Sequence, residues 1–476
     1  MDELGQARLR AFGQRWLMIL IFVTLPLVTM ANPTPHQLVA GLGQAQVALR
    51  HGQPAAAAES LAQAIRWSPD HLGLRLKAAS LAVDTGQAQI VRRALDHPAL
   101  ANSTAGGCLG LQGSILDAEP SAALEILEQL PASCPPPVAA TQALADKALQ
   151  AGQIETSLSL YQTLSRVQPD DLTLQRTIAL LLSLSTPSEA AGRLRQYQRE
   201  AETQDLLITD LIGTIERASA VGEPAFTYAQ IGQVFLQHQK WLEASLAFDQ
   251  SLKSDPDYFE ARAYYGLALD QLGKHEQAKD EIEKAQRQAP SEPLPAYLLS
   301  RFWLNAEQAA PAQRYARIAR LAEPSNPAYT AQLASAYAAS GDLQKAEELY
   351  LEAVQLSGAQ AEFLGLLADF YLRNEIDLAS GVRTARRAYM LNPSALNTGR
   401  LGYAHYLAGD LRLAERFLQS ATRLDPTLAS AHFHYGLVLI ELGAGKDAAD
   451  EWRQAVELDP TGQWGTLAAR ALARFE

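Results

Sequence analysis

The sequence predicts an all-α protein whose main part is an α-solenoid of stacked helix–turn–helix repeats. Three observations support this prediction: a recurring small residue, two further small-residue series with the same period, and a helix breaker that closes each unit. The first series holds Gly232, Gly266, Ser300, Ala334, Ala368, Gly402 and Gly436, always 34 positions apart. A fixed period of this length is typical of a repeat array.

Each unit is expected to contain two antiparallel helices, with the small residues where the helices approach each other. The second series is Ala244, Ala278, Ala312, Ala346, Gly381, Ala414 and Ala448, and the third is Ser251, Ala285, Ala319, Ala353, Ala388, Ala421 and Ala455. The breakers are Pro256, Pro290, Pro324, Gly358, Pro393, Pro426 and Pro460. Proline cannot continue a helix, so each breaker ends the second helix of its unit. One extra residue between Arg373 and Ser380 accounts for the offset at Gly381.

This pattern resembles the tetratricopeptide repeat family, whose 34-residue motif has small residues at positions 8, 20 and 27 and proline at position 32. Residues 225–462 correspond to seven consecutive units of that motif. The resemblance implies a right-handed superhelix whose first helices line a concave surface. A single hairpin of this size cannot bury its apolar face, so neighbouring units must stack.

The rest of the chain is predicted to be helical but less regular. Residues 32–171 contain degenerate hairpins of the same kind, and residues 172–224 form an irregular helical joint with helices at Leu172–Ser185, Ser188–Glu202 and Asp205–Val221. Residues 463–476 are predicted to be a capping helix, with charged residues toward water.

The first 31 residues are expected to be a signal peptide or a membrane anchor. Arg8, Arg10 and Arg15 precede an uncharged apolar run at residues 16–31, which ends in small residues. This order is typical of a secretory signal. The run is short for a spanning helix and contains Pro26, yet an uncleaved tether through residues 16–31 also fits. Either alternative predicts repeats outside the cytoplasm, in a secreted, periplasmic or membrane-anchored protein.

Cys108 and Cys134 are the two cysteines of the chain, and they flank a predicted hairpin at residues 109–130. Antiparallel helices would bring both ends of that hairpin to the same side. In an oxidising compartment the two thiols could therefore form a disulfide.

The sequence gives little support to catalysis or to cofactor or metal binding. The Gly106–Gly113 segment lacks the strand and the Lys-Ser/Thr of a phosphate loop, and we interpret it as a loop and a closely packed helix. His432 and His434 lie two residues apart, so on a helix they point to different sides. The net charge of −12 argues against nucleic-acid binding. We therefore expect a protein that is not an enzyme.

The resemblance implies partner-binding positions on the first helices, at motif positions 2, 5, 9, 12 and 13. Carried onto this sequence, these positions predict a groove lined by Gln233, Gln237, Asp270, Gln271, Tyr297, Arg301, Asn305, Asp369, Arg373, Tyr403 and Tyr406. Aromatic and arginine side chains are frequent anchors of recognition surfaces. The sequence favours a protein-interaction scaffold in envelope or secretion-complex assembly that binds a peptide or protein. The alternative is an accessory factor in polysaccharide export or cell-wall metabolism that binds glycan along Tyr403 and Tyr406.

Overall fold

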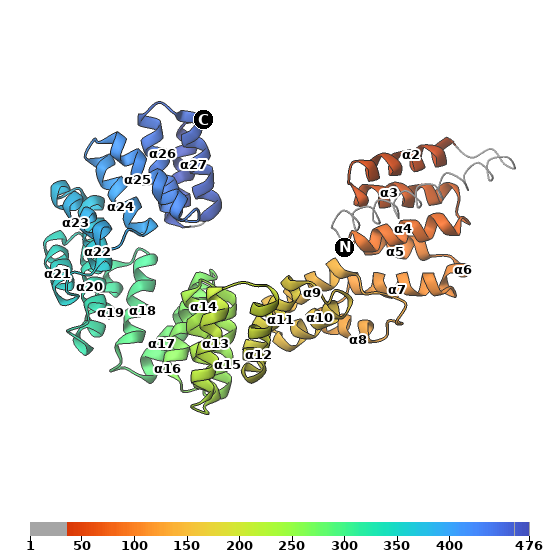
Figure 1. Cartoon of the computed structure of the whole chain (residues 1–476), viewed down its shortest axis with the longest axis horizontal. Helices are drawn as coiled ribbons and strands as arrows, with labels where there is room; N and C mark the ends of the chain where they lie inside the picture. Colours follow the sequence, from red (N-terminus) through yellow and green to blue (C-terminus); the bar gives the residue numbers. More distant parts are fainter. Residues whose placement is uncertain (1–35, 461, 476) are drawn as a thin grey trace. The chain divides into compact units, whose positions relative to one another are not determined.

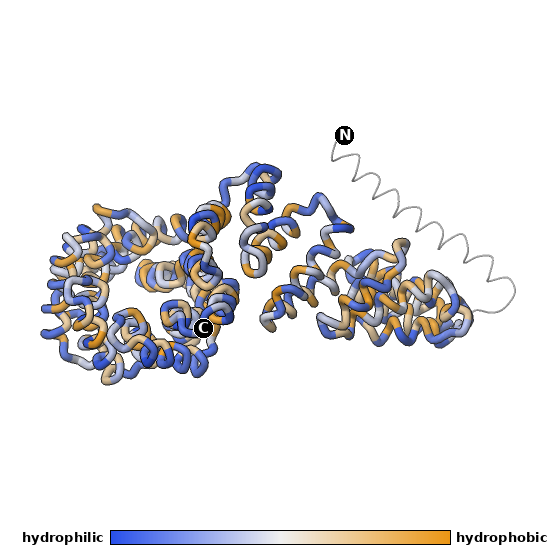
Figure 2. The backbone as a smooth tube through the Cα atoms, turned by 90° about the horizontal axis from the view of Figure 1, so that it is seen from below, coloured by the Kyte–Doolittle hydropathy of each residue, from blue (hydrophilic) through white to orange (hydrophobic). Residues whose placement is uncertain are grey.

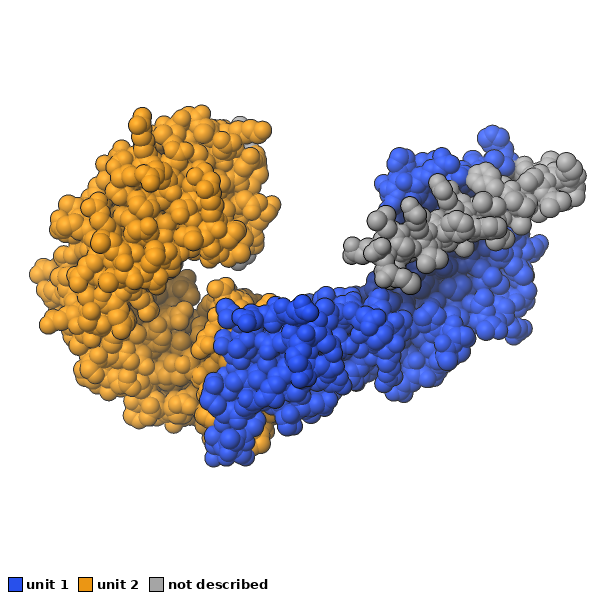
Figure 3. Space-filling view, in the orientation of Figure 1, with its two compact units in different colours: residues 1–223 blue, residues 224–476 orange. Residues whose placement is uncertain are grey.

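The fold is seen in a computed structural model of the chain, which describes residues 36–460 and 462–475. These residues form 27 α helices, one short 3-10 helix and no strand, which confirms the prediction of an all-α fold. The predicted signal or anchor, residues 1–31, lies outside the described residues. The chain divides into two compact units, Met1–Glu223 and Pro224–Glu476 (Figure 3).

In unit 1, most helices pack against their neighbours in the sequence. Its helices are α2 (His36–Arg50), α3 (Pro54–Ala64), the 3-10 helix η1 (Ile65–Trp67), α4 (Leu72–Asp84), α5 (Ala88–Leu95), α6 (Pro98–Ala101), α7 (Thr104–Leu116), α8 (Pro120–Glu128), α9 (Val138–Gln150), α10 (Ile154–Val167), α11 (Leu172–Ser185), α12 (Pro187–Glu200) and α13 (Leu206–Ser219). The residues predicted to form a joint are α11, α12 and α13. Helix α11 packs against both α10 and α12, so the stacking of neighbours continues through this stretch.

The α7–α8 hairpin carries the disulfide of the chain. Cys108 lies in α7 and Cys134 follows α8, and a disulfide joins them with their Cα atoms 5.7 Å apart. The glycine-rich segment belongs to α7, where a Cβ atom on Gly113 would lie 2.5 Å from Cγ1 of Val91 in α5. The glycine therefore allows α5 and α7 to approach closely.

Unit 2 contains seven helix pairs followed by one terminal helix. The pairs are α14 (Pro224–Gln237) and α15 (Trp241–Ser254), α16 (Phe259–Gln271) and α17 (His275–Gln288), α18 (Pro293–Asn305) and α19 (Ala309–Ala322), α20 (Pro327–Ala339) and α21 (Leu343–Leu356), α22 (Ala361–Asn374) and α23 (Leu378–Leu391), α24 (Ala395–Leu407) and α25 (Leu411–Leu424), and α26 (Ala429–Glu441) and α27 (Gly445–Leu458); the terminal helix is α28 (Gln463–Phe475). The extra residue of the fifth pair lies in the turn between Glu375 and Leu378.

The first small-residue series marks the closest approach of the two helices in a pair. A Cβ atom on Gly232 would lie 2.7 Å from the ring of Phe248, and one on Gly266 would lie 2.4 Å from Ile282. The small residue of the even-numbered helix thus makes room for a large residue of its partner. Protein interiors are close-packed, so a small residue is needed wherever a large side chain fills the space between the two helices. The small residue and its large partner therefore recur together with the sequence period.

The turn inside each pair depends on one left-handed residue, a feature that the sequence analysis did not use. The residues with positive φ recur every 34 positions: Gln239, Gly273, Glu307, Gly341, Glu375, Gly409 and Gly443. Four of the seven are glycine, which adopts this conformation without steric cost. The other three are ordinary residues held in a conformation that L-amino acids disfavour.

The helices of unit 2 follow a strongly curved path (Figures 1 and 2). Each even-numbered helix packs against the next even-numbered helix, from α14 to α28, and these contacts are more extensive than those between successive odd-numbered helices. In a curved array of helices, successive helices lie closer together on the inner, concave side than on the outer side. The even-numbered helices are therefore the inner layer, and Figure 1 shows α22 and α24 inside α23 and α25.

The helices within residues 36–460 and 462–475 are all too short or too polar to cross a membrane.

Candidate partner-binding groove

The inner layer of unit 2 carries an aromatic cluster that brings together residues from four successive even-numbered helices. We define the C-terminal aromatic cluster as Arg373 (α22), Tyr403 and Tyr406 (α24), His434 (α26) and Trp464 (α28). The His434 ring stacks on the Tyr403 ring with centroids 4.0 Å apart, and the Tyr406 ring lies 6.2 Å from Tyr403. Trp464 meets His434 edge to face at 4.9 Å, and the guanidinium of Arg373 lies 5.8 Å from the Trp464 ring.

Burial controls the charge of this cluster. Loss of solvent, with a smaller contribution from the positive charge of Arg373, lowers the pKa of His434 to about 3. Burial and the nearby carboxylate of Glu375 raise the pKa of Tyr403. Both rings are therefore neutral at neutral pH, and the Arg373 guanidinium is the cationic group within the cluster.

A local turn positions Trp464 at the start of α28. The backbone N–H of Trp464 donates to Oδ2 of Asp459 at 2.9 Å, and the N–H of Gly465 donates to the same oxygen at 3.3 Å. A carboxylate that accepts the free N–H groups at a helix start stabilises that start. Asp459 thereby holds the backbone of Trp464, whose indole contacts His434.

A second cluster lies on the inner layer nearer the start of unit 2. We define the tyrosine cluster as Tyr264 (α16), Tyr297 (α18) and Tyr329 (α20). The rings of Tyr297 and Tyr329 have centroids 5.3 Å apart, and the guanidinium of Arg301 lies 5.8 Å from the Tyr297 ring. The Tyr264 ring stacks at 5.8 Å on Phe248 of α15, so the cluster continues into the core between helices.

The structure gives the other predicted groove residues different surroundings. Asp369 accepts hydrogen bonds from the guanidinium of Arg400 on α24, at 2.8–2.9 Å. Asp270 lies 2.8 Å from Nδ1 of His275, in the turn of its own helix pair. Four residues lie on α14, α16 and α18 apart from both clusters: Gln233 is half-buried, whereas Gln237, Gln271 and Asn305 are exposed.

The structure therefore brings together two sets of predicted residues: Tyr297 with Arg301, and Arg373 with Tyr403 and Tyr406. Sequence reasoning missed His434, Trp464, Tyr264 and Tyr329. Trp464 could have been found, because α28 continues the repeat phase and Trp464 falls at position 2 of an eighth unit. The other three lie at motif positions 6 and 3, outside the positions used for the prediction.

His432 and His434 have separate surroundings. Nδ1 of His432 lies 2.6 Å from Oε2 of Glu451 on α27, and Nε2 lies 3.0 Å from the carbonyl of Pro426. The hydrogen bond with Glu451 raises the pKa of His432. The two imidazoles thus belong to different contacts, and across residues 36–460 and 462–475 no group of three His, Cys, Asp or Glu could hold a metal ion.

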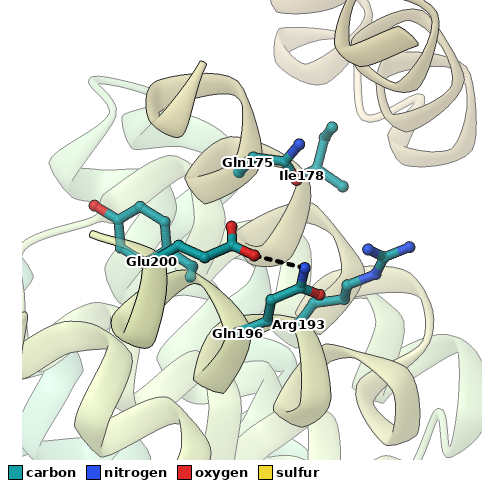
Figure 4. A pocket seen from close by; sticks show the side chains of 6 residues that line it. Gln175, Ile178, Arg193, Gln196 and Glu200 are labelled. Atoms are coloured by element: carbon teal, nitrogen blue, oxygen red, sulfur yellow. Dashed lines mark hydrogen bonds between the residues drawn. The ribbon is translucent and has the colours of Figure 1, made fainter. Parts of the chain in front are cut away.

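Unit 1 has a small pocket between α11 and α12 (Figure 4). Gln175, Ile178 and Arg193 line it, and Gln196 donates a hydrogen bond to Glu200 at its edge, at 2.8 Å. Its accessible volume is about 10 Å³, which is room for about one water molecule. This pocket is too small for a substrate.

Comparison with protein families identifies the repeats of unit 2. Sequence models described as tetratricopeptide repeat match residues 230–293 and 398–462, and another of the same description matches residues 331–360. The repeats of unit 2 are tetratricopeptide repeats. The predicted tetratricopeptide α-solenoid is thereby confirmed, and such repeats are typical of non-enzymatic scaffolds for protein–protein interaction.

The chain is similar to curated proteins over a short stretch. Protein HemY of Escherichia coli strain K12 is 41% identical over 58 residues, which are 12% of this chain and 14% of HemY. Protein HemY of Shigella flexneri gives the same values. The match thus spans about one seventh of the length of these relatives.

Solved structures are similar to the chain over longer stretches, at low identity. The APC/C hetero-tetramer Cut9–Hcn1 contains a chain with a TM-score of 0.43 and 13% identity, over 95% of this chain and 98% of that chain. Yeast Tom70 has a TM-score of 0.43 and 13% identity, over 92% and 89%. PilF of Pseudomonas aeruginosa has a TM-score of 0.37 and 16% identity, over 46% and 98%.

Proposed function

We propose that this protein is a non-catalytic scaffold outside the cytoplasm that binds a peptide or protein partner along the inner layer of unit 2. The C-terminal aromatic cluster is the observation that supports the proposal most directly. Arg, Tyr and Trp side chains are enriched among residues that dominate binding energy. Here they come from four adjacent helices, so one partner segment could contact all of them.

The exposure of the cluster also supports binding. The side chain of Arg373 is exposed, while Tyr403, Tyr406 and Trp464 are half-buried. Their packing against one another holds the rings in place before a partner arrives. A preorganised surface loses less conformational entropy on binding than a flexible one does.

The proposed location rests on two features. Residues 1–31 begin with a segment that contains arginines and continue with an apolar run, an order typical of a secretory signal or an anchor. The Cys108–Cys134 disulfide is of the kind that persists in oxidising compartments. Within that location we propose a role in envelope or secretion-complex assembly. Digestion of unit 2 by a protease added to intact spheroplasts would support this location, and complete protection would contradict it.

Cross-linking affinity purification from native envelope tests the binding proposal. The test variant is Arg373→Ala/Tyr406→Ala on the inner layer. The matched control is Arg314→Ala/Tyr315→Ala, which removes an arginine–tyrosine contact of 5.5 Å from the odd-numbered helix α19. We expect the control to retain the cross-linked partner and the test variant to lose it. Equal retention by both variants would contradict binding on the inner layer.

A second candidate function is glycan binding in polysaccharide export or cell-wall metabolism. The nearly parallel rings of Tyr403 and Tyr406, inclined by 20°, favour this candidate, because tyrosine offers an apolar face and a polar hydroxyl to a ligand. Titration calorimetry with soluble cell-wall oligosaccharides tests it. Heat of binding that Tyr406→Ala abolishes would favour glycan over peptide, and the absence of such heat would remove this candidate.

A further inference from the structure

Three carboxylates border the tyrosine cluster at one edge of the inner layer. Glu260 lies in the first turn of α16, Glu292 directly precedes α18, and Glu323 directly follows α19, in the turn that leads to α20. The three tyrosines occupy the first two turns of the same three helices. All three glutamates are exposed, whereas the tyrosines are half-buried. An acidic rim thus borders one edge of an aromatic surface.

The carboxylates are close enough to act on the tyrosine hydroxyls. Burial, and then the negative charge of Glu323, raise the pKa of Tyr329 to about 12, and Glu292 adds to this effect. Burial, and then Glu260, raise the pKa of Tyr264. The three carboxylates therefore place negative charge near the hydroxyl end of the cluster, where a cation would be attracted.

A cation already lies against this surface. The Arg301 guanidinium lies 5.8 Å from the centroid of Tyr297, a distance at which the ring attracts a cation. Arg301 extends from the following turn of α18, whereas Glu260 and Glu292 lie at the starts of α16 and α18 and Glu323 lies in the turn before α20. The rim end of the cluster has the negative charge, and the Arg301 contact shows that a guanidinium fits a tyrosine of this cluster.

We propose that the tyrosine cluster and its rim, Glu260, Glu292 and Glu323, bind a Lys or Arg side chain of the partner segment. This inference rests on the proposed function, because it names the chemistry of one part of the same inner layer. The partner segment is basic where it crosses α16, α18 and α20. Charge complementarity also speeds association and disfavours acidic segments.

The glutamates also have a structural explanation. A negative charge near a helix start offsets the helix dipole by about 0.3–1 kcal/mol, and Glu260 and Glu292 lie at such starts. A purely structural role would affect the stability of α16 and α18 without affecting the affinity for a cation. Affinity is therefore the measurement that separates the two roles.

Fluorescence anisotropy with defined peptides tests the proposal on the full chain. The probe is a fluorescein-labelled Gly–Ser peptide that carries three arginines. Its comparison peptide has citrulline in their place, which keeps the shape and removes the charge. The test variant is Glu292→Gln/Glu323→Gln. The control, Glu276→Gln/Glu348→Gln, removes the same charge from exposed positions on the odd-numbered helices α17 and α21.

We expect the arginine peptide to bind wild type and the control equally, and the test variant about fivefold more weakly, since two exposed ion pairs contribute modestly. We expect the citrulline peptide to bind more weakly than the arginine peptide does. Equal affinity for both peptides, equal weakening in both variants, or no binding of the arginine peptide would overturn the proposal. If Glu292→Gln/Glu323→Gln captured the cross-linked partner as efficiently as wild type while Arg373→Ala/Tyr406→Ala lost it, this inference would fail and the proposed function would stand.

Discussion

A Cβ atom on Gly436 would lie 2.3 Å from the indole nitrogen of Trp452, so the glycine and the tryptophan form a fitted pair between α26 and α27. The same indole nitrogen donates a hydrogen bond to the carbonyl of Phe433 at 3.2 Å. Trp452 is buried, with 4% of its surface exposed. The absence of a side chain at Gly436 therefore sets the distance between the two helices of the last pair.

Gly436→Ala should destabilise unit 2, because the added methyl group must displace Trp452 and weaken its hydrogen bond. Overpacking of a filled core costs about 1–3 kcal/mol. Faster amide hydrogen exchange in α26 and α27 would report this loss. The control is Gly192→Ala in α12, where a Cβ atom would meet nothing within 4 Å. There the same substitution should stabilise its helix by about 0.5–1 kcal/mol, and equal effects at the two sites would refute the packing argument.

Glu307→Gly should stabilise the turn between α18 and α19. Glu307 has a φ of 58°, and the matching residue of the next pair, Gly341, has a φ of 86°. A residue with a Cβ atom in this conformation loses about 1–2 kcal/mol. Glycine removes this conformational cost, but it also loses more backbone entropy on folding. The free energy of unfolding, measured by urea denaturation, should therefore rise by about 0.5–1 kcal/mol. The reverse change, Gly341→Ala, should lower stability, and a gain there would contradict the reasoning.

His434 should make unit 2 less stable as the pH falls below about 6.5. Burial lowers its pKa from 6.5 to about 3, so the unfolded chain takes up a proton over this interval while the folded chain does not. The stabilisation is present above pH 6.5 and decreases by up to about 1.4 kcal/mol per pH unit down to about pH 3.

The comparison of wild type with His434→Phe isolates this effect. Phenylalanine keeps the ring against Tyr403 and does not titrate. His432, whose raised pKa acts in the opposite direction, is present in both proteins. Urea denaturation at several pH values should show wild type losing stability relative to the variant as the pH falls. Parallel curves would show that His434 is protonated equally in both states.

Reduction of the disulfide should destabilise unit 1. Cys108 and Cys134 are separated by 26 residues, and a loop of that size corresponds to about 3–4 kcal/mol of lost entropy in the unfolded chain. Thermal unfolding with and without dithiothreitol measures the difference. The variant Cys108→Ser/Cys134→Ser should unfold like the reduced protein and ignore the reductant. If reductant lowered the stability of wild type and variant alike, the loss would not come from this bond.

Much of unit 2 could be predicted because its information is local and repeated. The small residue at Gly232 and the large residue at Phe248 belong to one helix pair, so the small residue recurs in the sequence every 34 residues. The proline or glycine at each unit end is a second recurring pattern. Both patterns depend on contacts between neighbouring segments and do not require knowledge of the distant chain.

The site was predicted less well, because motif position does not fix which side chains meet. Tyr297 and Arg301 lie four residues apart on α18, so their contact follows from helix geometry alone. Asp270 occupies a predicted groove position but lies against His275 of its own turn. His434, two residues from His432, stacks on a tyrosine of another helix pair, which no spacing within α26 predicts.

The sequence by itself determined the repeat, the order of the helices and the residues at which each pair closes, because these depend on interactions within one or two adjacent units. Only the tertiary structure decided that Arg373 of α22 meets Trp464 of α28 and that Tyr264, Tyr297 and Tyr329 gather at an acidic edge. Such meetings depend on the curvature that accumulates over successive helix pairs. Small rotations between successive helix pairs add up along the array, and no single residue of the chain determines their sum.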